Sequence, residues 1–217
     1  MADSRNKDLV VLFDFDGVIS DTEGLYTEFW DVEGRKYFAE EDFGMKIKGQ
    51  TFKHLSGYFK SDEDRIRVMN DIDEFERNMP YDLIPGALDF LKQLKEAGIP
   101  TAIVTSSHNK KMENAWRANP GLKEMVTTVL TSDDFSKSKP DPECFIKAMD
   151  RLGGRPENTI VFEDSLHGIA AGKAAGAYVV GLATTFPREV IAPLCDMVTD
   201  DFTTMDLAQL QGIVVRK

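Results

Sequence analysis

Two aspartates one residue apart, Asp14 and Asp16, directly follow an apolar run with β-strand composition at residues 9–13. Side chains alternate along an extended strand, so both carboxylates leave on the same side, and Gly17 lets the backbone turn away at once. Two close carboxylates repel each other unless a cation or a proton lies between them. The pair therefore suits a hard divalent metal, an acid/base pair or both, and a solvated aspartate-rich turn is the alternative.

A second polar cluster follows a later apolar run. Residues 105–109 bring hydroxyls and backbone donors, among them Thr105 and Ser106, to an expected helix start, where proteins often bind phosphate. Helix capping by Ser107 or Asn109 is the alternative, and the cluster taken alone favours that reading.

Two more candidate groups come from the second half of the chain. Lys139 begins a Lys-Pro-Asp-Pro run, in which two prolines fix the backbone and aim the lysine, although lysines in charged loops are usually solvated. Glu163 and Asp164 place two further carboxylates at the end of an expected strand. Ser165 suits the cap of the next helix.

The elements that position these residues alternate between helix and strand from residue 85 onward. The expected helices cover 85–98, 109–118, 142–152, 165–175 and 204–211, and the expected strands 9–13, 99–104, 126–130, 159–162 and 178–182, with a short edge strand at 197–198. This alternation predicts an α/β fold with a doubly wound, mostly parallel sheet. Such sheets bind ligands beyond the carboxyl ends of their strands, which is where the candidate residues fall.

Residues 18–80 are expected to be entirely helical. Apolar spacing predicts a helix from Thr22 to Tyr37 that Gly34 interrupts, a loop at 44–50, and a helix from residue 62 to Met79. The latter helix is expected to bury Ile66, Met69, Ile72, Phe75 and Met79. We therefore expect a helical cap at 18–80, inserted into a core formed by 1–17 and 81–217.

Composition excludes several classes of function. The 217 residues carry a net charge of −11, which opposes general affinity for nucleic acid or an anionic membrane. The only cysteines, Cys144 and Cys195, form no spaced metal motif. With no apolar stretch of signal or membrane-span length, we expect a cytoplasmic protein, with a monomer favoured.

Four motifs together resemble those of the haloacid dehalogenase superfamily, and most closely its β-phosphoglucomutase-like phosphatases with a helical (C1-type) cap. They are Asp14-x-Asp16-Gly17-Val18 with Asp21-Thr22-Glu23; Thr105; Lys139-Pro140-Asp141-Pro142; and Glu163-Asp164-Ser165 with Gly168. Each lies at the end of an expected strand, in the family's order.

The resemblance implies phosphoryl transfer through an aspartyl phosphate. Asp14 would be the nucleophile, and Asp16 the general acid that protonates the leaving oxygen and then activates the acceptor. Thr105 would hydrogen-bond the phosphoryl group, with Ser106 also contacting substrate, and Lys139 would neutralise charge. Dehalogenases of the family lack an aspartate at the position of Asp16, so phosphoryl transfer is favoured.

The same resemblance implies Mg²⁺ as cofactor. Its ligands would come from Asp14, the backbone carbonyl of Asp16, and Asp164, with Glu163 beside them. Mg²⁺ and the lysine would together offset the carboxylates so that a phosphate dianion can approach.

Substrate choice in this family is made by the cap, where the candidates are Tyr26, Lys48, Gly49 and Gln50, with Lys46 as a further possibility. The sugar mutases have a histidine where this chain has Tyr26, and an arginine in the cap loop that is missing here. We therefore expect a phosphatase acting on small phosphomonoesters such as sugar phosphates, with a hexose phosphate mutase as the alternative.

A non-catalytic ligand-binding member of the family is a further alternative. Loss of one of the four central residues would mark it, but Asp14, Asp16, Lys139 and Asp164 are all present. None of the three histidines, His54, His108 and His167, is expected to be catalytic.

Overall fold

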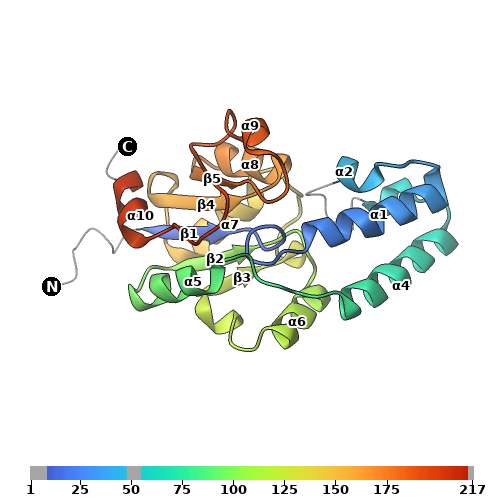
Figure 1. Ribbon diagram of the computed structural model, residues 1–217, viewed down its shortest axis with the longest axis horizontal. Coiled ribbons are helices and arrows are strands. Elements are labelled where there is room, and N and C mark those ends of the chain that lie inside the picture. The colour runs from blue at the N-terminus through green and yellow to red at the C-terminus, as the bar shows by residue number, and fades with distance from the viewer. Residues whose placement is uncertain (1–8, 48–54, 215–217) are drawn as a thin grey trace.

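The computed structural model describes residues 9–47 and 55–214. Its centre is a six-stranded parallel sheet with the order β3-β2-β1-β4-β5-β6 (Figure 1). The strands are β1 (Val10–Phe13), β2 (Thr101–Val104), β3 (Thr128–Leu130), β4 (Thr159–Glu163), β5 (Tyr178–Leu182) and β6 (Met197–Thr199). The predicted α/β class and parallel sheet are confirmed, including the short strand at the edge.

Helices cover both faces of the sheet. Those of the core are α5 (Ala87–Glu96), α6 (Asn109–Ala118), α7 (Glu143–Leu152), α8 (Leu166–Ala174), α9 (Arg188–Ile191) and α10 (Leu207–Val214). Helices α5, α6 and α10 pack in one hydrophobic cluster with Val11 and Phe13, and α7, α8 and α9 pack in another with Val10 and Leu12. Because neighbouring residues of β1 face opposite layers, all four are buried.

An aromatic group lies beneath the end of β1. The rings of Phe13 and Phe162 stack with centroids 5.0 Å apart, and Phe90 and Phe202 pack against both. Phe13 directly precedes Asp14, so this packing holds the strand end that carries the first aspartate.

The helical segment after β1 projects from one end of the sheet (Figure 1). It contains α1 (Glu23–Phe38), α2 (Phe43–Ile47), a 3₁₀ turn (Ser56–Tyr58) and α4 (Asp62–Asn78). The segment has its own apolar cluster, formed by Trp30, Phe43, Ile47, Leu55, Phe59, Val68 and Ile72. A membrane-spanning helix is absent from residues 9–47 and 55–214.

Two expectations about the first half of this segment were wrong. Helix α1 continues without interruption through Gly34, and residues 44–47 of the expected loop belong to α2. The rest of that loop, 48–50, lies outside the described residues. The physical reason is the same for both, because α2 packs directly on Gly34. A Cβ built on Gly34 would lie 2.3 Å from the Cβ of Phe43, so the glycine allows the two helices to meet.

The buried face of α4 matches the expected one only in part, because Ile72 and Met79 are buried as expected. Ile66 and Met69 are 60% and 49% exposed, whereas Val68 and Ile72 are buried together with Glu76. The buried positions of α4 recur every four residues and include the carboxylate of Glu76. A prediction from apolar residues alone therefore cannot identify the full buried face of this helix.

Replacing Gly34 by alanine should destabilise the fold by about 1–3 kcal/mol, because the added methyl group overlaps Phe43. Gly24→Ala in the same helix is the matched control, since no described atom lies within 4 Å of its added Cβ. Urea unfolding should show the control unchanged or stabilised by up to about 1 kcal/mol. Equal losses in the two variants would contradict the close packing of α1 on α2.

Candidate active site

Lys139 joins two of the predicted carboxylates. Its Nζ donates to Asp14 Oδ1 at 2.8 Å, to Glu163 Oε1 at 2.7 Å and to the carbonyl of Val104 at 3.2 Å. These partners lie at the carboxyl ends of the adjacent strands β2, β1 and β4. The lysine is 3% exposed, so the expectation that the Lys-Pro-Asp-Pro run aims it inward is confirmed over the solvated alternative.

Glu163 is fully buried and both of its oxygens are engaged. While Oε1 accepts from Lys139, Oε2 accepts from the backbone amides of Asp164 and Ser165 and from the Ser165 hydroxyl, each at 3.0 Å. A Cβ on Gly168 would lie 1.7 Å from Oε1, so only glycine leaves room for this carboxylate. Ser165 also caps α8 by accepting from the Gly168 amide, as expected.

Asp164 is also fully buried, but only one of its two carboxylate oxygens accepts a hydrogen bond from a described residue. Its Oδ2 accepts a short hydrogen bond from Thr185, whereas Oδ1 has no hydrogen-bond partner among the described residues. Gly17, in the left-handed conformation with φ of 73°, approaches so closely that a Cβ there would lie 2.0 Å from Oδ2. Burial, together with the carboxylates of Glu23, Glu163 and Asp14, raises the pKa of Asp164 well above its ordinary value.

The same crowding acts on Asp14. Burial raises the pKa of Asp14 to about 7, with further increases from Glu163 and Asp16, against the opposing effect of Lys139. Although burial disfavours a charged lysine, Asp14 and Glu163 raise the pKa of Lys139 above its ordinary value. One ammonium group therefore faces several carboxylates.

These oxygens fit a hard divalent cation. Asp14, Glu163 and Asp164 each offer a carboxylate oxygen, and the three atoms lie within 4.8 Å of one another. Mg²⁺ prefers oxygen ligands, and the unpartnered Oδ1 of Asp164 is an available one. The donor set and its excess negative charge agree with the predicted cofactor.

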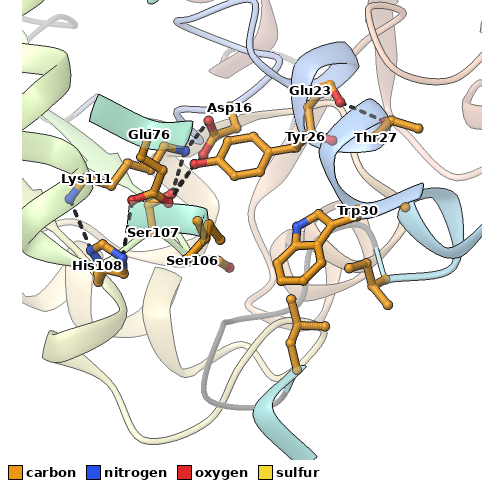
Figure 2. Close-up of a pocket in the computed structure, with 14 residues that line it drawn as sticks. Asp16, Glu23, Tyr26, Thr27, Trp30, Glu76, Ser106, Ser107, His108 and Lys111 are labelled. Carbon is orange, nitrogen blue, oxygen red and sulfur yellow. Dashed lines mark hydrogen bonds and ion pairs between the residues drawn. The ribbon is translucent and has the colours of Figure 1, made fainter. Parts of the chain in front are cut away.

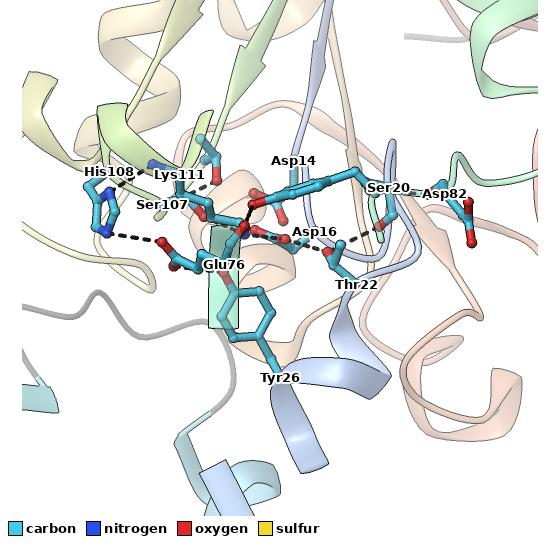
Figure 3. Close-up of polar contacts among 12 residues, drawn as sticks. Asp14, Asp16, Ser20, Thr22, Tyr26, Glu76, Asp82, Ser107, His108 and Lys111 are labelled. Atoms are coloured by element: carbon cyan, nitrogen blue, oxygen red, sulfur yellow. Dashed lines mark hydrogen bonds and ion pairs between the residues drawn. The ribbon is translucent and has the colours of Figure 1, made fainter. Parts of the chain in front are cut away.

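Asp16 is held by a different lysine. Its Oδ1 accepts from the Thr22 hydroxyl at 2.5 Å and from Lys111 in a short ion pair, and its Oδ2 accepts from Ser107 at 2.9 Å (Figure 3). Burial alone would raise the pKa of Asp16, but Lys111 and these hydrogen bonds lower it below its ordinary value. Asp14 and Asp16 thus belong to separate ion pairs.

Sequence reasoning missed Lys111. It lies one helical turn after Ser107, to whose hydroxyl it also donates at 2.8 Å, and is only 1% exposed. No local signal pointed to it, because Ser107 lies before the helix and a lysine in the first turn of α6 is ordinarily solvated.

The cap of α6 was also assigned wrongly. His108 is the N-cap, and its Nδ1 accepts from the Lys111 amide at 3.1 Å. Ser107 binds Asp16 instead, and the Asn109 side chain donates to Asp133. Thr105 is fully buried, and its hydroxyl accepts from the Ser107 amide at 3.0 Å, which shapes this turn.

A cavity of about 100 Å³ opens beside Asp16, between the helical segment and the start of α6 (Figure 2). Tyr26 and Ser106, both predicted to contact substrate, line it. The predicted residues Lys48, Gly49 and Gln50 lie outside the described part of the chain. Lys46 is exposed and pairs with Glu40 at 2.9 Å.

Comparison with known proteins establishes the family. Residues 9–176 match the family described as "Hydrolase: haloacid dehalogenase-like hydrolase". The chain therefore belongs to the haloacid dehalogenase-like hydrolases, an enzyme family, and the resemblance found in its motifs is confirmed.

The relatives of this chain include both phosphatases and phosphomutases. The validoxylamine A 7'-phosphate phosphatase of Streptomyces hygroscopicus subsp. limoneus is 31% identical over 202 residues, covering 89% of this chain and 94% of its own. A β-phosphoglucomutase of Mycobacterium bovis is 28% identical over 236 residues, covering 92% and 90%. A family IA, variant 3 hydrolase of Entamoeba histolytica shares the fold, with a TM-score of 0.81 at 24% identity over 95% of this chain and 99% of its own.

Neutralising Asp164 should weaken Mg²⁺ binding far more than neutralising Glu163. Asp164→Asn removes charge from an available oxygen, whereas both Glu163 oxygens already accept from protein donors. We expect Kd for Mg²⁺ to rise more than about 100-fold in Asp164→Asn and about tenfold in Glu163→Gln, by isothermal titration calorimetry. Equal losses would identify Glu163 as a direct ligand.

Proposed function

We propose that this protein is a Mg²⁺-dependent phosphatase that hydrolyses small phosphomonoesters, such as sugar phosphates, through a phosphorylated Asp14. The observation that carries the proposal is the buried lysine bridge from Asp14 to Glu163 beside the unpartnered oxygen of Asp164. A carboxylate nucleophile, an ammonium group and oxygen ligands for a metal thus converge at one sheet edge, as phosphoryl transfer requires.

Asp14 supplies the nucleophilic carboxylate. At neutral pH its raised pKa of about 7 leaves part of it protonated, and a protonated carboxyl group is a poor nucleophile. Lys139 favours the ionised form and also lies where charge on the phosphoryl oxygens needs compensation. Thr105 and Ser106, at the end of the neighbouring strand, orient the phosphoryl group.

Asp16 supplies the proton for the leaving oxygen and later takes one from the attacking water. Thr22, Ser107 and Lys111 hold both of its oxygens, which fixes the direction of the carboxylate. Because Lys111 stabilises the ionised form, the arriving phosphate monoester must weaken this pair before Asp16 can act as an acid.

Asp14 and Asp164 would hold the Mg²⁺, together with the backbone carbonyl of Asp16, and the bound ion would neutralise phosphate charge. Glu163 instead positions Lys139, since its oxygens are already occupied. Residues 18–80 act as a cap over the site, separate from a core of 1–17 and 81–217, and exclude water from it.

The relatives include both phosphatases and mutases, so the acceptor must be tested directly. Hydrolysis is favoured because Tyr26 stands where the resembling sugar mutases have a histidine, and its hydroxyl donates to Glu76. The substrate class follows the phosphatase relative, whose name specifies a phosphorylated compound.

Asp14→Asn should abolish turnover and leave the fold intact, because an amide occupies nearly the same volume but cannot attack phosphorus. We expect kcat to fall roughly 10,000-fold or more. Asp89→Asn on the exposed surface of α5 is the control and should keep full activity. Mass spectrometry of quenched wild-type enzyme should find phosphate on Asp14, and phosphorylation at another residue would refute the assignment.

The wild-type enzyme should release inorganic phosphate from β-glucose 1-phosphate supplied with a trace of the 1,6-bisphosphate, and form little glucose 6-phosphate. Both products can be followed in the same reaction by coupled assays. Rapid formation of glucose 6-phosphate with little free phosphate would make the protein a mutase.

A further inference from the structure

Glu76 of α4 is a buried carboxylate that the catalytic scheme does not use. It is 3% exposed, and its Oε1 accepts from the Tyr26 hydroxyl at 2.8 Å. Its Oε2 lies 3.4 Å from His108 Nε2 but accepts no hydrogen bond from any residue in the described ranges. A buried carboxylate oxygen that accepts no hydrogen bond is costly, and the neighbouring His108 Nε2 does not supply one, so this oxygen calls for a functional explanation.

A metal ion is a poor explanation for this oxygen. Asp73, Glu76 and His108 do bring ligand atoms close together. However, the Nδ1 of His108 accepts from the Lys111 amide, so in the neutral ring Nε2 carries the proton and offers no lone pair. Asp73 in turn is paired with Lys110 at 2.5 Å. The geometry instead favours a hydrogen-bond donor approaching Glu76 from the cavity.

The cavity shows what kind of molecule could bring that donor. Glu76 lines it together with Asp16, Lys111 and Tyr26, and Figure 2 shows the Tyr26 hydroxyl directed toward Glu76. Apolar side chains also line the cavity, among them Trp30, Ile47, Leu55 and Ile72. A ligand that extends from Asp16 into this cavity would contact the carboxylate of Glu76, which is a hydrogen-bond acceptor, and these apolar side chains.

Charge argues against a second phosphate in the same space. Lys111, the lysine among the described lining residues, is already paired with Asp16. Glu23 and Glu76 add two further carboxylates to the lining. Among the described lining residues, a distal phosphate would therefore face repulsion from Glu76 without an unpaired lysine to offset it.

We propose that Glu76 is a substrate-binding residue that accepts a hydrogen bond from a hydroxyl or ammonium group on the alcohol portion of the phosphate monoester. The substrate carries a single phosphate, a donor that reaches Glu76 and an apolar face that packs against Trp30. This inference rests on the proposed phosphatase function and narrows its substrate class.

The electrostatics of Glu76 agree with such a partner. Burial raises the pKa of Glu76 above its ordinary value, and Lys111 and His108 only partly oppose this effect. A donor from the substrate would stabilise the ionised form at the moment of binding. An ammonium group would do so more strongly than a hydroxyl, because hydrogen bonds between charged groups are stronger.

The test compares substrates that differ only in the donor. Monophosphates of diols and amino alcohols with two to five carbons are assayed against alkyl phosphates of matched length. The series of chain lengths is needed because the distance from the phosphate to the donor that suits Glu76 is not specified in advance. Wild-type kcat/KM should favour the donor-bearing ester at the best chain length by about tenfold or more.

Glu76→Gln should reduce that preference about tenfold or more for the ammonium series and less for the hydroxyl series, since glutamine still offers an acceptor oxygen.

Tyr26→Phe, which removes the hydrogen bond that orients Glu76, is the second variant and should reduce the preference by a smaller factor. Glu74→Gln, an exposed carboxylate on the same helix, is the matched control and should leave the preference unchanged. Circular dichroism confirms that each variant is folded.

The outcomes separate the two proposals. An unchanged preference in both folded Glu76 and Tyr26 variants, or a wild-type enzyme that favours alkyl phosphates or bisphosphates, would overturn the role of Glu76 while leaving the phosphatase intact. If the wild-type enzyme hydrolysed none of these esters, nor p-nitrophenyl phosphate, the proposed function itself would fail, and this inference with it.

Discussion

The repulsion among buried carboxylates at the carboxyl edge of the sheet is the constraint on which the rest of the structure depends. Asp14, Glu163 and Asp164 lie close together in a region almost without solvent, and Lys139 compensates only part of their charge. Such an arrangement is unfavourable for folding alone and becomes favourable only when cations complete it. The arrangement is therefore pre-organised to receive a divalent cation.

The surrounding fold holds this strained group in place through close packing. Gly17 and Gly168 each leave space that a side chain would fill, against Asp164 and Glu163 respectively. Below the site, the ring of Phe13 stacks on that of Phe162, which joins β1 to β4 directly beneath the carboxylates. Rigid strand ends and small residues together determine where the charges can lie.

A second polar group links the catalytic edge to the helical segment. Lys111 pairs with Asp16 and lies 4.4 Å from the centre of the Tyr26 ring, and Tyr26 in turn donates to Glu76 (Figure 3). Asp16 and the wall of the neighbouring cavity are thus in contact through one lysine and one aromatic ring.

The sequence by itself determined the sheet, the order of the motifs and the residues at the strand ends, because strand periodicity, glycine turns and proline runs are local signals. Only the tertiary structure decided which polar and charged side chains pair with one another. Lys111 pairs with a carboxylate 95 positions away and Glu76 accepts from a tyrosine 50 positions away, and no local pattern distinguishes either residue from a solvated one. The buried stripe of α4 was likewise decided by packing, because Ile66 and Val68 are equally apolar and only contact with α1 and α2 separates them.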